Sequence, residues 1–225
     1  MSDINEAVPI LCEDFCQELS AVEGSSFDRV YGGDPPSRVI ARTPNLALLA
    51  DLSPLCVGHL LLVPNRHYLS FAQAVQDHYD EVTDVTDAVL TLYSRTFGHA
   101  AVLEHGSAAD TEGSACITHA HWHILPVDGA LVAARMHADG LHHTDLGSLQ
   151  DLEPVAELQV PYFYLAHGRY RQVYGTGRVM RPQYLRSVVG RILGIPDPEW
   201  DWALVVRREA LRLTVQATRE WKVDK

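Results

Sequence analysis

The 225-residue chain lacks two features that would direct it to a membrane or out of the cell. No apolar stretch approaches the ~18 residues that a transmembrane helix needs. The N-terminus, MSDINEAVPIL, shows no basic segment followed by a long apolar run, so no signal peptide is visible. These two absences predict a cytoplasmic protein that does not bind membranes.

Positive charge and cysteine are also scarce. The formal net charge is −11, so the surface as a whole repels nucleic acid, and a phosphate site would need its positive charge gathered locally. The four cysteines, which we expect to be free thiols in a reducing compartment, are Cys12, Cys16, Cys56 and Cys116. Cys12 and Cys16 are predicted to be two small residues on one side of a helical turn, or half of a structural zinc site that could include His67.

Strand and helix patterns follow one another in an order that predicts an α+β fold. Short apolar runs bounded by turn residues predict strands at 38–43, 46–51, 59–64, 99–106 and 115–127. Between the third and fourth runs, residues 71–98 have apolar side chains at three- and four-residue steps, which is typical of an amphipathic helix. We therefore expect an antiparallel sheet of about five strands with one long packed helix.

The rest of the chain predicts a lead-in and an extension. Residues 1–37 read as a short helix and a turn-rich link, and 38–130 as the core. Residues 131–225 read as a C-terminal α/β extension packed on that core, with strands near 161–168 and 171–175 and a helix at 182–194.

Three histidines stand at alternate positions in ITHAHWHILP. Side chains two apart in a strand share a face, so His119, His121 and His123 would form a row of imidazoles about 6.6 Å apart on a rigid support. Such a row could chelate zinc, or one neutral imidazole could attack phosphorus while its neighbours hold the phosphate. The alternative is that two of the three are ordinary strand residues.

This pattern resembles the histidine triad family, in which His-x-His-x-His precedes two apolar residues. ADLSPLCVGHLLLVPNRH at 50–67 and VLEHG at 102–106 resemble two further motifs of the family, in the family's order. The match covers about 38–127, and the tail resembles the extension of a longer, bacterial-type branch. The resemblance implies a nucleotide hydrolase with a histidine triad fold that needs no cofactor for catalysis, and commonly a homodimer.

The resemblance also implies roles for individual residues. His121 would be the nucleophile that takes the nucleotidyl group, His119 would orient it, His123 would contact the phosphate or leaving group, and His59 would lie nearby. Asp51 would bind the ribose hydroxyls and Leu52 would line the base pocket. Asp51 could instead cap a turn, Leu52 could be core, and His59 could be an ordinary strand residue.

The chain departs from the family pattern at two substrate-binding positions. Glu104 stands where the family has a phosphate-contacting asparagine, and Cys116 where it has a hydroxyl residue. We expect the extension to supply compensating charge, because six arginines and no acidic residue lie between 168 and 191. The candidates for phosphate binding are Arg178, Arg181, Gln183 and Arg186, although these arginines could also form a solvated face.

Three classes of function remain open on the sequence alone. The leading hypothesis is a hydrolase that cleaves a phosphoramidate, a dinucleoside polyphosphate or a nucleotide sugar at the α-phosphorus through a nucleotidyl-histidine. A transferase or phosphorylase would use the same intermediate with a different acceptor. A non-catalytic nucleotide-binding module is the second class, and a zinc-dependent hydrolase with the triad as ligands is the third.

Overall fold

The computed structural model describes residues 13–20, 24–108, 119–176 and 180–223. The helices are α1 (Glu13–Leu19), α2 (Ser26–Tyr31), α3 (Phe71–Thr96), α4 (Gly129–Ala138), α5 (Glu153–Leu158), α6 (Tyr184–Ile192) and α7 (Arg208–Thr218), with a 3₁₀ helix η1 (Leu149–Leu152). The strands are β1 (Val39–Arg42), β2 (Leu46–Ala50), β3 (Leu60–Pro64), β4 (Ala101–Gly106), β5 (Trp122–Leu125), β6 (His143–Asp145), β7 (Tyr162–His167) and β8 (Tyr170–Gly175).

All eight of these strands form one antiparallel sheet in the order β1-β2-β3-β5-β4-β7-β8-β6. β7 pairs with β4 over six residue pairs, so the strands of the C-terminal extension continue the sheet of the core. The predicted α+β class, the antiparallel sheet and the single long helix are confirmed, with extra C-terminal elements. The division of the chain at 37 and 130 stays a prediction.

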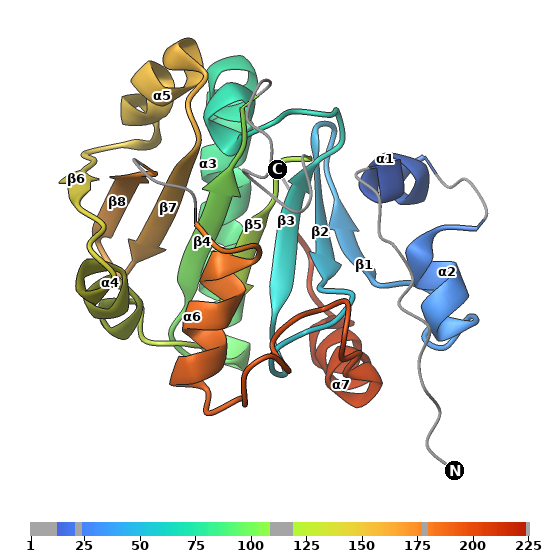
Figure 1. The fold of residues 1–225 in the computed structure, drawn as a ribbon. Helices are drawn as coiled ribbons and strands as arrows, with labels where there is room; N and C mark the ends of the chain where they lie inside the picture. Colours follow the sequence, from blue (N-terminus) through green and yellow to red (C-terminus); the bar gives the residue numbers. More distant parts are fainter. Residues whose placement is uncertain (1–12, 21–23, 109–118, 177–179, 224–225) are drawn as a thin grey trace.

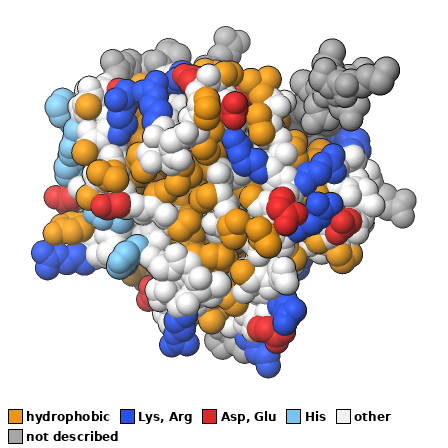
Figure 2. Space-filling view, turned by 90° about the horizontal axis from the view of Figure 1, so that it is seen from below, with side chains coloured by type: hydrophobic (Ala, Val, Ile, Leu, Met, Phe, Trp, Pro, Cys, Tyr) orange, Lys and Arg blue, Asp and Glu red, His pale blue; other side chains and the backbone are white. Residues whose placement is uncertain are grey.

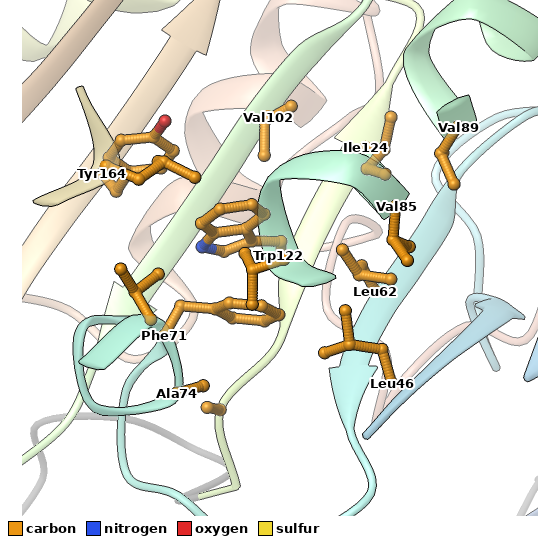
Figure 3. Packing of buried hydrophobic residues seen from close by; sticks show 14 of the residues in the cluster. Leu46, Leu62, Phe71, Ala74, Val85, Val89, Val102, Trp122, Ile124 and Tyr164 are labelled. Atoms are coloured by element: carbon orange, nitrogen blue, oxygen red, sulfur yellow. The ribbon is translucent and has the colours of Figure 1, made fainter. Parts of the chain in front are cut away.

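Helix α3 covers the back face of the sheet (Figure 1). Its apolar positions Val75, Val82, Val85 and Val89 are buried, as the three- and four-residue spacing predicts, and burying each is worth about 1.5–3 kcal/mol. Under the helix, the rings of Phe71, Trp122 and Tyr164 stack in succession (Figure 3). This aromatic stack fixes Trp122, which lies between two histidines of the triad.

The front face carries α4 and α6, which pack against β4 and β7 (Figure 1). Val188 and Val189 of α6 are buried there with Leu103 and Phe163 of the sheet. Farther along the same face, Phe15 and Leu19 of α1 lie on Leu61 and other residues of β2 and β3. Both faces of the central strands are thus covered, which explains why every residue of β2 and β3 is buried.

The strand that carries the triad begins later than predicted. β5 starts at Trp122, so only His123 of the three histidines lies in a strand, and residues 115–118 of the predicted segment fall outside the described residues. The chain before Trp122 is held by single contacts, such as the Ala120 amide that donates to the carbonyl of Tyr68 at 2.7 Å. The regular strand thus carries only one of the three imidazoles, although the rings of His121 and His123 lie 4.8 Å apart and Phe15 contacts the rings of both His119 and His121.

None of the described helices is long and apolar enough to cross a membrane. On the face seen in Figure 2, acidic and basic side chains are interspersed, with no broad basic area. β4 lies in the interior of the sheet, and the two edge strands are β1 and β6. A homodimer that extends this sheet would have to use one of those two edges.

Candidate active site

The β2–β3 hairpin brings Asp51 and His59 together. Asp51 directly follows β2 and His59 directly precedes β3, and the Asp51 amide donates to the His59 carbonyl at 3.0 Å. The intervening loop turns back on itself because the Ser53 amide donates to Oδ1 of Asp51 at 2.8 Å. The turn-capping alternative for Asp51 is thus part of what the structure shows.

His59 and His123 form a hydrogen-bonded pair whose tautomers are fixed by the backbone. The Leu55 amide donates to Nδ1 of His59 at 3.1 Å, so the neutral ring carries its proton on Nε2. That Nε2 lies 2.9 Å from Nδ1 of His123, which must accept. The proton of neutral His123 is therefore on Nε2, the nitrogen that remains free to donate to a ligand.

His121 has the opposite tautomer. Its Nδ1 lies 2.8 Å from the carbonyl oxygen of His119, which can only accept, so Nδ1 carries the proton. Nε2 of His121 then bears a free lone pair. Burial is the main reason that the pKa of His121 is lowered, which keeps the ring neutral, yet the residue is still partly exposed. A neutral, half-buried imidazole with a free nitrogen can act as a nucleophile.

His119 belongs to a different cluster. Its Nε2 donates to the Pro64 carbonyl at 2.8 Å, so the lone pair is on Nδ1, and the side chain is fully buried. Nδ1 lies 3.5 Å from Sγ of Cys16, and Nδ1 of His67 lies 3.6 Å from the same sulfur. Two ligands of a tetrahedral zinc, one sulfur and one nitrogen, are about 3.5 Å apart, so these three residues fit a metal ion.

Helix α1 supplies the sulfur and is anchored by buried contacts. Arg38 is 3% exposed and donates to both carboxylate oxygens of Glu18, at 2.8 and 2.6 Å. Phe15 of the same helix contacts the rings of His119 and His121, with both centroid distances at 5.6 Å. The position of Cys16 thus depends on packing that the sequence pattern did not indicate.

Arg186 reaches the site from α6. Its Nη1 lies 3.4 and 3.3 Å from the two carboxylate oxygens of Asp51, and Oδ2 of Asp51 is also 3.6 Å from Nε2 of His59. Burial alone would raise the pKa of Asp51, but His59 and Arg186 reverse this effect and hold that pKa well below its usual value. The extension therefore contributes a charged side chain to this part of the chain.

The structure does not bring Glu104 to these histidines. Leu103 pairs with His123 on the front of the sheet, so the neighbouring Glu104 points to the back, beneath α3. Its carboxylate accepts from the Phe71 amide, the Trp122 indole and the Tyr162 hydroxyl at 2.6, 3.1 and 2.7 Å. Burial raises the pKa of Glu104 to about 7. Its contacts are those of a residue that fixes Trp122, and the predicted substrate contact is not supported.

The remaining predicted residues lie apart from the histidines or outside the described residues. Leu52 packs with α2 and α7. Arg181 pairs with Asp197 at 3.4 Å, and Gln183 donates to Asp201 at 2.6 Å. Cys12, Cys116 and Arg178 fall outside the residues that the structure describes.

His105 is a site residue that the sequence reasoning missed. It lies two residues after Leu103 on the front of β4, and its ring contacts Phe163 at 4.6 Å. Burial is the largest cause that lowers the pKa of His105 to about 4, and proximity to His121 adds to it. The period-two alternation of VLEHG could have identified it, since it places His105 and not Glu104 on the face of His123.

The family model described as HIT domain matches residues 33–130. This part of the chain is therefore similar to a HIT domain. An uncharacterised HIT-like protein of Methanocaldococcus jannaschii is 28% identical over 102 residues, which are 44% of this chain and 76% of that protein.

Two solved structures show weaker likeness to this chain. A hypothetical histidine triad nucleotide-binding protein from Sulfolobus tokodaii is 20% identical, with a TM-score of 0.37, over 50% of this chain and 67% of that chain. A Hit-like protein involved in cell-cycle regulation from Bartonella henselae is also 20% identical, with a TM-score of 0.30, over 45% and 78%.

Proposed function

We propose that the HIT domain cleaves a nucleoside phosphate derivative at its α-phosphorus through a nucleotide bound covalently to His121. The observation that carries this proposal is the tautomer pattern. The carbonyl of His119 requires the proton of His121 on Nδ1, so Nε2 has a free lone pair. Fixing the tautomer orients the nucleophile before the substrate arrives.

The reaction would proceed in two displacements. Nε2 of His121 forms a bond to phosphorus, and the bond from phosphorus to the leaving group breaks. A phosphate leaves as an anion, and an amine leaves neutral with a proton taken from water. Nε2–H of His123 donates to a phosphoryl oxygen, as its bond with His59 requires. Water then attacks phosphorus and releases a proton to the solvent, the phosphorus–nitrogen bond breaks, and the nucleoside monophosphate leaves with His121 neutral again.

A rapid-quench experiment tests this mechanism. With an adenylyl substrate labelled at the α-phosphorus, we expect an acid-labile, base-stable adduct on His121 during turnover. His121→Asn should form no adduct but still bind the nucleoside monophosphate, and His99→Gln, which changes an exposed histidine, should behave as the unmodified protein. Turnover with no adduct on His121 would contradict the covalent mechanism.

A transferase or phosphorylase would use the same adduct with a phosphate acceptor in place of water. The partly exposed ring of His121 gives either acceptor access, so the products formed with and without added inorganic phosphate distinguish them. A non-catalytic binding module would bind nucleoside monophosphates in a calorimetric titration and form no product. The substrate class, the enzyme class and a homodimer remain proposals, and light scattering tests the dimer.

We also propose that Cys16, His67 and His119 hold a structural zinc ion. The support is the fit of the sulfur–nitrogen distances, 3.6 and 3.5 Å, to one tetrahedral ion. A zinc ion there would tie α1 to the loop before α3 and to the triad segment. The ion would take no part in the attack on phosphorus, because neither His121 nor His123 belongs to the group of residues that could hold it.

A further inference from the structure

The carboxylate of Asp51 is fully engaged by other groups of the protein. Oδ1 accepts from the Ser53 amide at 2.8 Å, and Nη1 of Arg186 lies 3.4 and 3.3 Å from the two oxygens. Oδ2 is also 3.6 Å from Nε2 of His59. Asp51 and Arg186 are each only 6% exposed. With its side chain 8% exposed, this carboxylate is largely buried and paired with a cation.

Arg186 is held as firmly as its partner. Its Nη2 donates to the Ser53 carbonyl at 2.7 Å, and its Nε donates to the Trp200 carbonyl at 3.2 Å. All three nitrogens of the guanidinium thus have partners in two different segments of the chain. Helix α6 cannot withdraw Arg186 from Asp51 without breaking these bonds as well.

A sugar hydroxyl that bound Asp51 would have to compete with Arg186 for this buried carboxylate. Separating the pair would leave a buried carboxylate or a buried guanidinium unpaired, which costs far more than a bond to a neutral hydroxyl returns. Among the described residues near His121, Nε2–H of His123 is a donor, and His105 and Phe15 present neutral rings. Such a site suits a phosphate better than a diol.

We propose that the Asp51–Arg186 pair closes the sugar-reading position of this site, so that substrates are selected by their phosphate chemistry and not by their ribose hydroxyls. The inference deepens the proposed function and rests on it. The substrate class is nucleoside 5′-phosphate derivatives, with ribo and deoxyribo forms accepted alike. Arg186 is then a positioning residue that acts through Asp51, and no contact of it with substrate is required.

The test compares three substrates: the 5′-phosphoramidates of adenosine, 2′-deoxyadenosine and 3′-deoxyadenosine. We expect the unmodified protein to cleave all three with kcat/KM values within about threefold, because no group discriminates among the sugars. A preference for the ribo substrate of about 30-fold or more would overturn the inference, since discrimination of that size requires a bond to the hydroxyls.

Variants at the pair give a second, independent readout. Asp51→Asn should slow all three substrates by the same factor, because Asp51 supports His59 and not the sugar. A loss confined to the ribo substrate would overturn the inference. Arg186→Met should raise the ribo preference at least about tenfold by freeing the carboxylate. Arg191→Met, at an exposed position of the same helix, is the matched control and should change neither rate nor preference.

Failure of the proposed function can be distinguished from failure of this inference. If none of the three substrates is cleaved, the hydrolase proposal fails, and the affinities for AMP and 2′-deoxy-AMP are measured by calorimetry instead. Equal affinities support the closed sugar position, and a strong preference for AMP overturns it. Because Asp51→Asn is nearly isosteric, it keeps the test valid even if Arg186→Met does not fold.

Discussion

Two clusters of metal-ligand residue types flank His121, and their hydrogen bonds differ. Cys16, His67 and His119 form the first, and Asp51, His59 and His123 form the second. In each, the ligand atoms lie within 4.8 Å of one another, so distance alone does not distinguish the two. The hydrogen bonds to neighbouring groups do distinguish the two clusters.

The first cluster places one nitrogen of each histidine beside the same sulfur. Pro64 takes the Nε2 proton of His119, which leaves the Nδ1 lone pair next to Sγ of Cys16. The second cluster uses its nitrogens on each other, since His59 donates to His123 at 2.9 Å, and Arg186 already supplies the cation for Asp51. The roles proposed for the two clusters, metal binding and catalysis, therefore rest on backbone hydrogen bonds and on one arginine.

Replacing one histidine in each cluster by glutamine should give the largest difference in activity between two variants. His123→Gln removes the donor to the phosphate, and we expect kcat to fall by about 10²–10⁴-fold with nucleotide affinity little changed. His67→Gln, at an exposed position of the other cluster, should lower zinc content but leave kcat within about threefold. Steady-state kinetics and metal analysis of both proteins check this. Equal losses of activity would contradict the division of roles.

Metal removal should affect stability and not chemistry. An ion present at 1,000 times its dissociation constant stabilises the folded state by about 4 kcal/mol, so a chelator should lower the melting temperature measurably. Cys16→Ser should show the lower melting temperature without chelator, whereas Cys56→Ser, a partly buried cysteine outside both clusters, should still respond to chelation. Loss of turnover in chelated but folded protein would favour a zinc-dependent hydrolase instead.

The pH dependence of the free energy of unfolding should report on His59 of the second cluster. Burial is the largest cause that lowers the pKa of His59, to about 4 from 6.5. Between these values the unfolded chain binds more protons, so the stability conferred by neutral His59 is fully present above pH 6.5 and is lost as the pH falls through 4. The shift corresponds to about 3 kcal/mol.

Urea unfolding of chelated protein at several pH values measures this effect. Chelation removes the proton release that accompanies metal binding, so the remaining slope belongs to buried histidines such as His59, His105 and His119, each with a pKa lowered to about 4. His59→Gln should reduce the slope between pH 6.5 and 4 without abolishing it, because His105 also has a pKa of about 4. Identical slopes in the two proteins would show that His59 is not held neutral by the fold.

The elements of the fold were largely predictable, because periodicity reports which side chains are buried. The spacing of Val75, Val82, Val85 and Val89 predicted α3, and continuous apolar runs predicted β2 and β3. The start of β5 was not predictable, since His119 and His121 are held by Pro64 and by a local bend, and alternation of residue types cannot show either contact.

The candidate site was also predictable from the sequence only in part. The motif identified His59, His119, His121 and His123 and placed Asp51 beside them, but it did not separate His119 into a metal cluster. Glu104 was misplaced because a motif alignment ignores which face of β4 a residue occupies. Among the arginines between 168 and 191, sequence could not choose Arg186, because the choice depends on how α6 packs on the front of the sheet.

The sequence by itself determined the residue types, their alternation in the strands and the amphipathic period of α3, because these are local properties of the chain. Only the tertiary structure decided the tautomers, the partners of the carboxylates and the pairing of Arg186 with Asp51, 135 positions apart. Those properties depend on which backbone carbonyls and charges approach each side chain. Such contacts are set by packing between distant segments and by the low-dielectric interior that the packing creates.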